Sequence, residues 1–311
     1  MKNLRFAVIG LGALGGYYGG LLAKSGREVH FLARSNRDAV IGEGLRVDSP
    51  GGSFHLRHVN VYDRPEAMPK CDVVLISLKA TDNAALTSIL PHVLTESGTT
   101  LLIQNGLGQE ERLPEVALRG SVYAGLGFIC AHKAKPNHIV HEDYGTLRVA
   151  VYHEARSAQL LHGGVEGLAR ELRDAGIEIE LEPEFLLARW KKLVWNIPFN
   201  GLAVALRSNT AELMRGRNSS VLVRQLMLEV IAAGRSVGCA IADEYAQEML
   251  DGTERMRPYF PSMYHDFQAG RALELEAMYW IPIERARQPM PRVEMLARQL
   301  EHLSARRSGT H

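Results

Sequence analysis

A lysine and two asparagines share one face of an expected helix in the second half of the chain. Lys192, Asn196 and Asn200 follow one another at spacings of four residues, which places their side chains on the same side of an α-helix. The residues between them are largely apolar, so we expect the helix to be buried on most sides. An ammonium group and two amides on such a helix need partners, which a polar substrate could provide. The alternative is that Lys192 reaches solvent and the asparagines cap neighbouring loops.

A glycine-rich turn near the start of the chain has the spacing of a phosphate-binding loop. It lies between an expected strand and an expected helix and reads Gly10-Leu11-Gly12-Ala13-Leu14-Gly15. The first glycine allows a tight turn, the second lets the backbone approach a pyrophosphate, and the third lets helix and strand pack closely. The helix N-terminus adds N–H donors. The turn predicts a dinucleotide site, with a packing turn as the plainer alternative.

The residues after the second expected strand bear on the choice of cofactor. NAD sites commonly place an acidic residue there, about 20 residues beyond the glycines, to bind the ribose 2′-hydroxyl. This chain has no acid in residues 32–37, and Arg34 instead offers a guanidinium that can pair with a 2′-phosphate. We therefore predict NADP as the cofactor, unless Arg34 is an ordinary solvated loop residue.

Four further polar residues follow expected strands or enter expected helices. Lys79 and Asn105 come just after two strands, where open α/β sheets bind their ligands, although either could be a loop residue. Ser262 resembles a helix N-cap, and the default interpretation of Glu274 is a surface carboxylate.

The expected elements divide the chain into an α/β half and a helical half. The first half alternates strands and helices, which predicts a Rossmann-type, doubly wound parallel sheet. Its expected strands are Arg5–Ile9, Glu28–Leu32, Asp72–Ser77, Thr100–Gln104 and Ile177–Leu181, with an antiparallel edge within Ser121–Tyr152. Its expected helices are Ala13–Lys24, Asn83–Val93, Gln109–Leu113 and one with the apolar face Leu161, Val165, Leu168 and Leu172.

Strand patterns end at Pro183, near which we place the domain boundary. The two predicted domains are residues 1–183, which bind NADP, and residues 184–311, which are all-helical and bind the substrate. The second domain should contain helices over Glu184–Leu206, Asn218–Gly234, Asp243–Asp251 and Arg292–Ser304, and another after Pro261. A domain of this kind is compatible with a homodimer.

Composition excludes several classes of function. Thirty-six basic and 35 acidic residues leave a net charge of +1, which gives no reason to expect nucleic acid or a membrane surface as a partner. No apolar stretch approaches the roughly 18 residues that a transmembrane helix needs. The three cysteines form no CxxC pair, so we expect no metal site and a reducing, cytoplasmic location.

Taken together, these motifs resemble those of the ketopantoate reductases (2-dehydropantoate 2-reductases) over nearly the whole chain. The matching segments are GLGALGG from Gly10, LKA from Leu78, QNG from Gln104, K-L-x-x-N from Lys192, and Ser262-Met263 followed by Glu274. The resemblance implies NADPH-dependent reduction of a 2-oxo acid, ketopantoate, to the 2-hydroxy acid (R)-pantoate on the way to pantothenate and coenzyme A.

The same resemblance implies a role for each matching residue. Lys192 looks like the general acid, and an unperturbed lysine pKa of about 10.4 would keep it protonated at neutral pH. Asn196 and Asn200 look like substrate ligands, Ser262 like the serine that binds the carboxylate, and Glu274 like the acid that anchors the substrate hydroxyl. Asn105 and Lys79 look like residues near the nicotinamide and the cofactor phosphates.

One segment departs from the family pattern. After its glutamate the family usually has I-D-x-I-N-G, whereas this chain has Leu275-Glu276-Ala277-Met278-Tyr279-Trp280. Two bulky aromatics in place of a small polar pair should reshape either the pocket wall or the local helix packing. The alternatives are therefore a paralogue that reduces another 2-oxo acid, or a non-catalytic NADP-sensing protein.

Overall fold

The computed structural model describes residues 4–155 and 163–308, and its contacts divide the chain into two compact units. The sheet unit comprises residues 1–104 and 109–185, and the helical unit comprises residues 105–108 and 186–311. The short segment 105–108 thus belongs with the helices, although it lies far from them in the sequence. Leu161, which we placed on a helix face, lies outside the described residues.

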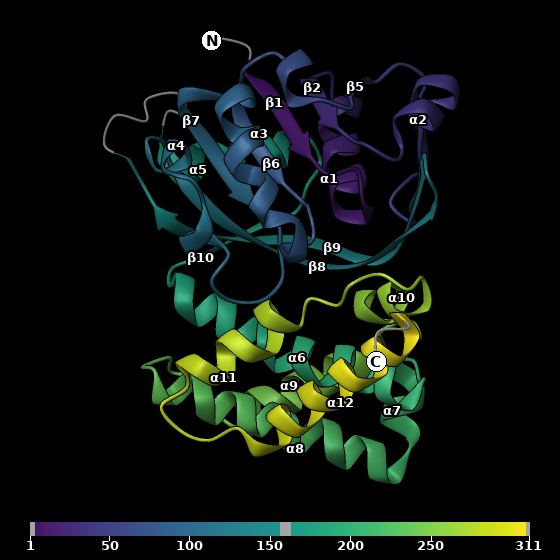
Figure 1. Cartoon of the computed structure of the whole chain (residues 1–311), viewed down its shortest axis with the longest axis vertical. Helices are drawn as coiled ribbons and strands as arrows, with labels where there is room; N and C mark the ends of the chain where they lie inside the picture. The colour runs from purple at the N-terminus through teal and green to yellow at the C-terminus, as the bar shows by residue number, and fades with distance from the viewer. Residues whose placement is uncertain (1–3, 156–162, 309–311) are drawn as a thin grey trace. The chain divides into compact units, whose positions relative to one another are not determined.

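The sheet unit is built on one ten-stranded sheet with the strand order β4-β3-β9-β8-β7-β6-β1-β2-β5 and β10 beside β9 (Figure 1). The strands are β1 (Arg5–Ile9), β2 (Glu28–Leu32), β3 (Leu45–Asp48), β4 (Phe54–Leu56), β5 (Asn60–Tyr62), β6 (Cys71–Ile76), β7 (Leu94–Leu102), β8 (Val122–Lys135), β9 (His138–His153) and β10 (Ile179–Glu182). From β5 to β8 neighbouring strands run parallel. The prediction of a doubly wound α/β sheet is confirmed.

Alternation along the strands explains why helices cover both faces of the sheet. Phe6 and Val8 of β1 pack into one apolar cluster, whereas Ala7 and Ile9 pack into another. Helices α1 (Ala13–Lys24) and α5 (Gly164–Asp174) contribute to the first cluster, and α3 (Leu86–Val93) and α4 (Glu115–Leu118) to the second. The unit also contains α2 (Arg37–Glu43) and short 3₁₀ turns at Pro65–Ala67, Ala80–Ala85 and Glu110–Arg112.

The antiparallel pair β8–β9 is not the edge that the sequence led us to expect. β9 also pairs in parallel with β3 and β10, so it lies inside the sheet. The strands β3, β4 and β5 are short and gave no clear alternation in the sequence. Strands of this length depend on their neighbours for pairing, which local sequence patterns do not reveal.

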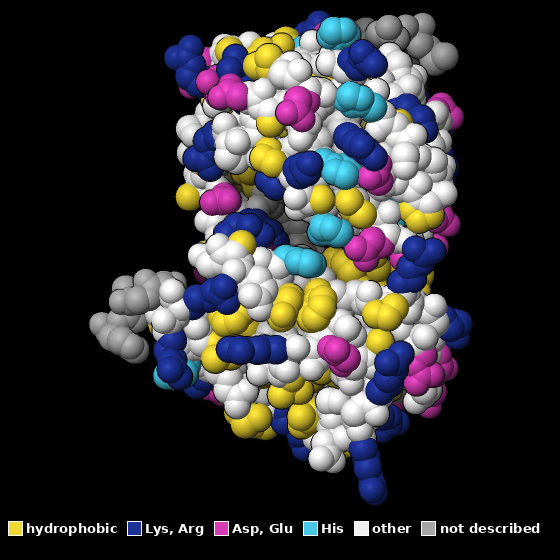
Figure 2. All heavy atoms as spheres, turned by 90° about the vertical axis from the view of Figure 1, so that its right-hand side faces the viewer, with side chains coloured by type: hydrophobic (Ala, Val, Ile, Leu, Met, Phe, Trp, Pro, Cys, Tyr) yellow, Lys and Arg dark blue, Asp and Glu magenta, His cyan; other side chains and the backbone are white. Residues whose placement is uncertain are grey.

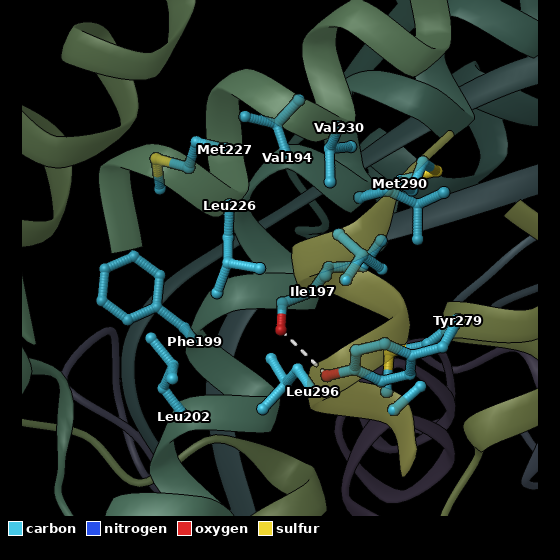
Figure 3. Packing of buried hydrophobic residues seen from close by; sticks show 14 of the residues in the cluster. Val194, Ile197, Phe199, Leu202, Leu226, Met227, Val230, Tyr279, Met290 and Leu296 are labelled. Atoms are coloured by element: carbon cyan, nitrogen blue, oxygen red, sulfur yellow. Dashed lines mark hydrogen bonds between the residues drawn. The ribbon is translucent and has the colours of Figure 1, made fainter. Parts of the chain in front are cut away.

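The helical unit is centred on the long helix α6 (Phe185–Leu206), much of which is buried. Around it lie α7 (Thr210–Arg215), α8 (Arg217–Ser236), α9 (Glu244–Arg255), α10 (Ser262–Gln268), a π-helical turn at Glu276–Trp280, α11 (Ile281–Arg285) and α12 (Pro291–Ser308). Figure 3 shows residues of α6, α8, α12 and the π-turn meeting in one apolar core. The helices predicted for this half of the chain are confirmed.

The surface agrees with the near-neutral composition. On the face shown in Figure 2, lysine and arginine side chains are interspersed with aspartate and glutamate. No described helix is both long and apolar enough to cross a membrane.

Candidate functional site

The glycine turn follows β1 at the point where the sheet changes direction. β1 lies between β2 and β6, so the chain leaves it on one side and later returns on the other, which is where such sheets bind ligands. Gly10 has a φ of +100°, and its amide donates to the carbonyl oxygen of Leu32 at 3.1 Å. The Ser77 hydroxyl donates to the Gly10 carbonyl at 2.7 Å and fixes the turn against the end of β6.

Two glycines of this turn are needed for different reasons. A methyl group on Gly15 would overlap the Gly10 carbonyl oxygen and the Ser77 hydroxyl, so the protein's own packing requires glycine there. A methyl group on Gly12 would meet no described atom within 4 Å beyond its chain neighbours and its own helix. Gly12 is also the N-cap of α1, where helical N–H groups lack intrahelical partners. Space next to N–H donors fits a dinucleotide pyrophosphate, and the residues present therefore suit the predicted cofactor.

A buried amide cluster holds the loop that carries Lys79. The Gln104 side chain donates to the Leu78 carbonyl at 2.9 Å and to Asn83 Oδ1 at 2.6 Å. Asn83 in turn donates to Gln109 Oε1 at 2.7 Å. These amides fix the backbone on either side of Lys79 and give Gln104 a structural role that the sequence did not suggest.

The contacts of Asn105 assign it to the helical unit, although it directly follows Gln104 of the sheet unit. The Leu107 amide donates to the Ala277 carbonyl at 2.9 Å, and Gly106, with a φ of +89°, leaves no room for a side chain against Ala277. Asn196 donates to Asn105 Oδ1 at 3.2 Å. The structure therefore brings two predicted site residues together from opposite halves of the chain.

The predicted face of α6 is buried. Lys192 is 8%, Asn196 5% and Asn200 2% exposed, so Lys192 does not extend along the surface. Asn200 donates to the Asn196 carbonyl at 3.0 Å and accepts from the Met263 amide at 3.2 Å. The alternative of a capping asparagine thus holds for Asn200, which caps α10 from a distant helix.

Ser262 and Glu274 differ from their default interpretations. Ser262 is the first residue of α10, and the N-cap is Pro261, so Ser262 does not cap the helix. The cap is supplied from α6 instead. Glu274 is 4% exposed and therefore is not a surface carboxylate. Carboxylates are seldom buried this deeply unless they are paired.

The divergent segment after Glu274 forms the π-turn and packs within the helical unit. The Tyr279 hydroxyl donates to the Ile197 carbonyl at 2.9 Å, as Figure 3 shows, and burial raises the pKa of Tyr279, which keeps it a donor. Gly201 makes room, because a methyl group there would lie 2.5 Å from the Tyr279 oxygen. Trp280 donates to Glu301 at 2.8 Å. The aromatic pair thus takes part in the helix packing of this unit.

A phosphate-binding turn on a doubly wound sheet, joined in one chain to a helical unit with a buried lysine, defines the class of two-domain, nucleotide-dependent oxidoreductases. Residues 6–154 match the family described as "Ketopantoate reductase PanE/ApbA", and residues 184–304 match its C-terminal part. The chain is 42% identical to a 2-dehydropantoate 2-reductase of Nostoc sp., over 98% of this chain and 97% of the relative. The chain belongs to the ketopantoate reductase family.

Solved structures agree with this assignment. A 2-dehydropantoate 2-reductase from Geobacter metallireducens superposes with a TM-score of 0.89 at 39% identity, covering 96% of this chain and 99% of the other. A D-mandelate dehydrogenase solved with NADH and anilino(oxo)acetate has a TM-score of 0.85 at 18% identity, covering 98% and 99% of the two chains. At that identity the second likeness concerns the fold alone.

Proposed function

We propose that this protein reduces 2-dehydropantoate to pantoate with NADPH. The whole-length similarity to a 2-dehydropantoate 2-reductase supports the reaction. The observation that carries the proposal is the burial of Lys192 and Glu274, two residues of the helical unit, together with the contact between Asn196 and Asn105. Buried polar groups cost free energy unless they are hydrogen-bonded, and a polar substrate offers further hydrogen bonds of this kind.

In the proposed reaction, the nicotinamide, when bound, supplies a hydride to C2 of the oxo acid. The Lys192 ammonium gives its proton to the carbonyl oxygen, so that the product leaves as an alcohol and the lysine regains a proton from water. Before the proton moves, the positive charge stabilises the developing alkoxide, and low solvent exposure strengthens that interaction. Asn196 donates through its amide to Asn105, which fixes its orientation one helical turn from Lys192.

The remaining substrate contacts are assigned to Ser262 and Glu274. The Ser262 hydroxyl would bind the substrate carboxylate, and Glu274 would accept the hydrogen bond of the substrate hydroxyl. Asn200 links these two parts of the unit, because it lies on the same helix as Lys192 and caps the helix that begins at Ser262. We therefore assign Asn200 a positioning role in addition to the predicted contact with substrate.

Most of the proposed cofactor contacts lie in the sheet unit, whereas Asn105, which is predicted to lie near the nicotinamide, belongs to the helical unit. The turn Gly10–Gly15 would hold the pyrophosphate on the N-terminus of α1, Lys79 would approach the phosphates, and Arg34, which is exposed, would bind the 2′-phosphate. The divergent segment was the reason to consider another 2-oxo acid as the substrate. Because Tyr279 packs in the apolar core, that segment now gives less reason to expect a different substrate. A homodimer through the helical unit remains a proposal that light scattering would test.

The test is to follow NADPH absorbance while ketopantoate and a panel of other 2-oxo acids are offered. The proposal predicts oxidation with ketopantoate at a kcat/KM at least about tenfold above the others, a preference worth about 1.4 kcal/mol. Preference for another oxo acid would show that the proposed substrate is wrong but would leave the proposed reductase mechanism in place. Tight NADPH binding without oxidation of any panel member would favour the non-catalytic, NADP-sensing alternative.

A further inference from the structure

One buried asparagine binds both residues that flank the segment 105–108. Asn83 lies in the 3₁₀ turn Ala80–Ala85 and is 9% exposed. Its amide nitrogen donates to Gln104 Oε1 at 3.1 Å and to Gln109 Oε1 at 2.7 Å. Both glutamines belong to the sheet unit, whereas the segment between them belongs to the helical unit. The Asn83 side chain therefore closes the base of this loop.

The same side chain supports the backbone beside Lys79. Asn83 Oδ1 accepts from Gln104 Nε2 at 2.6 Å, so the two amides bind each other twice. Gln104 Nε2 also donates to the Leu78 carbonyl at 2.9 Å. Lys79 is the N-cap of the turn that contains Asn83, and its carbonyl accepts from the Asp82 amide at 2.9 Å. Asn83 and its turn thus hold the backbone on both sides of Lys79.

The Leu78 carbonyl fixes the orientation of the amides in this cluster. A carbonyl oxygen can only accept, so the Gln104 atom that faces it is the nitrogen. The reciprocal pair then places the Asn83 nitrogen opposite Gln104 Oε1, and the same nitrogen faces the side-chain oxygen of Gln109. Both acceptors at the base of the loop therefore depend on the one donor group of Asn83.

We propose that Asn83 is a positioning residue for the reductase reaction, acting through Lys79 on the cofactor phosphates and through Asn105 on the substrate side. The inference rests on the proposed function, which gives these two residues their roles. Asn105 accepts from Asn196, a proposed substrate ligand, at 3.2 Å. Because both groups are assigned to binding rather than to proton transfer, their displacement should raise dissociation constants and KM more than it lowers kcat.

The test compares Asn83→Ala with the wild type and with a matched control, Asn137→Ala. Asn137 is also a buried asparagine of the sheet unit, 8% exposed, and its amide donates to Glu43 Oε2 at 3.1 Å and to the Gly44 carbonyl at 3.2 Å. Both variants should unfold at lower temperature, because each loses two donated hydrogen bonds.

The binding constants separate the two variants. We expect Asn83→Ala to raise the dissociation constant of NADPH and the KM for ketopantoate about fivefold each, while kcat falls less than about threefold. Asn137→Ala should change all three by less than about twofold, which a purely structural role of Asn83 would not predict.

Gln109→Met is a milder variant that separates the two connections of Asn83. It removes the acceptor at one end of the loop but leaves the contact between Gln104 and the Leu78 carbonyl. We expect the KM for ketopantoate to rise about threefold and the dissociation constant of NADPH to stay within about twofold. Combined with Asn83→Ala, it should raise the KM by less than the product of the two single effects, because both variants remove the same hydrogen bond.

Three outcomes decide the inference. Unchanged constants for NADPH and ketopantoate in Asn83→Ala, or equal changes in Asn137→Ala, would overturn it. If Asn83→Ala does not fold, Gln109→Met decides, and an unchanged KM for ketopantoate in that variant would overturn it. A wild-type protein that oxidises NADPH with no oxo acid would instead refute the proposed function, and the NADPH dissociation constants of the same variants would still decide the role of Asn83.

Discussion

The turn after β1 is the proposed pyrophosphate site and the turn after Glu274 follows a proposed substrate ligand, but their shapes are determined differently. The turn Gly10–Gly15 is specified by its own glycines and by contacts with the adjacent strand ends. The π-turn Glu276–Trp280 depends on distant partners, namely Ile197 on α6 and the segment 105–108. The comparison teaches that the proposed cofactor turn is specified largely by its own glycines, whereas the proposed substrate side is assembled from segments far apart in the sequence.

The largest expected effect separates packing from ligand binding within the glycine turn. Gly15→Ala should lower the free energy of unfolding by about 3 kcal/mol, because its methyl group overlaps backbone of the same turn. Gly12→Ala should change it by less than about 1 kcal/mol and yet weaken NADPH binding roughly tenfold. Chemical denaturation and cofactor titration check both. Equal destabilisation by the two variants would contradict the assignment of Gly12 to the pyrophosphate.

The next variant tests whether segment 105–108 is integral to the helical unit. Gly106→Ala places a methyl group against the Ala277 backbone at a φ of +89°, so we expect a loss of about 2 kcal/mol of stability. The KM for the oxo acid should rise more than the KM for NADPH, because Asn105 contacts Asn196. A larger effect on NADPH would place this segment functionally with the sheet unit.

A smaller effect is expected from the hydroxyl of the π-turn. Tyr279→Phe keeps the ring in the core but leaves the Ile197 carbonyl without this donor, which should cost about 1 kcal/mol. Thermal unfolding should shift accordingly, while NADPH binding to the sheet unit stays unchanged. Tyr18→Phe is the matched control in the other unit, since the Tyr18 hydroxyl also donates to a carbonyl, that of Gly145 at 3.3 Å.

The smallest effect concerns alkaline pH. Burial raises the pKa of Tyr18 and of Tyr279 above the unfolded value of about 10. The folded state therefore holds the two hydroxyl protons more tightly than the unfolded state does. The contribution of the protonated hydroxyls to the free energy of unfolding is complete below about pH 10 and is lost as the pH rises further. Stability measured from pH 8 to 11 should fall less steeply in either phenylalanine variant. If stability fell with pH as steeply in the variants as in the wild type, the pKa of neither hydroxyl would change on unfolding.

The sequence predicted what local patterns encode. The glycine turn, the doubly wound sheet and the helices after Pro183 follow from spacing and periodicity, and the structure confirms them. It could not show that Asn105 joins the helical unit, because that depends on a contact with Ala277 far along the chain. The short strands β3 and β4 were likewise missed because they are stabilised by pairing rather than by pattern.

The same limit explains the errors at the candidate substrate residues. Ser262 looked like a cap because its local sequence resembles one, whereas the structure supplies the cap from Asn200. Glu274 looked exposed because charged residues usually are, and only the packing of distant helices around it revealed its burial. The roles of both residues stay predictions.

The most direct test of the central claim compares two adjacent lysines of α6. Lys192→Ala and Lys191→Ala are assayed for ketopantoate-dependent NADPH oxidation at saturating substrates, with thermal unfolding measured alongside. Lys191 is partly exposed, and its ammonium lies 5.5 Å from the centroid of the Tyr245 ring. The account predicts that kcat falls at least about 100-fold in Lys192→Ala, the range of a lost general acid, and less than about threefold in Lys191→Ala. Equal rates in the two variants would contradict the assignment of Lys192 as the general acid.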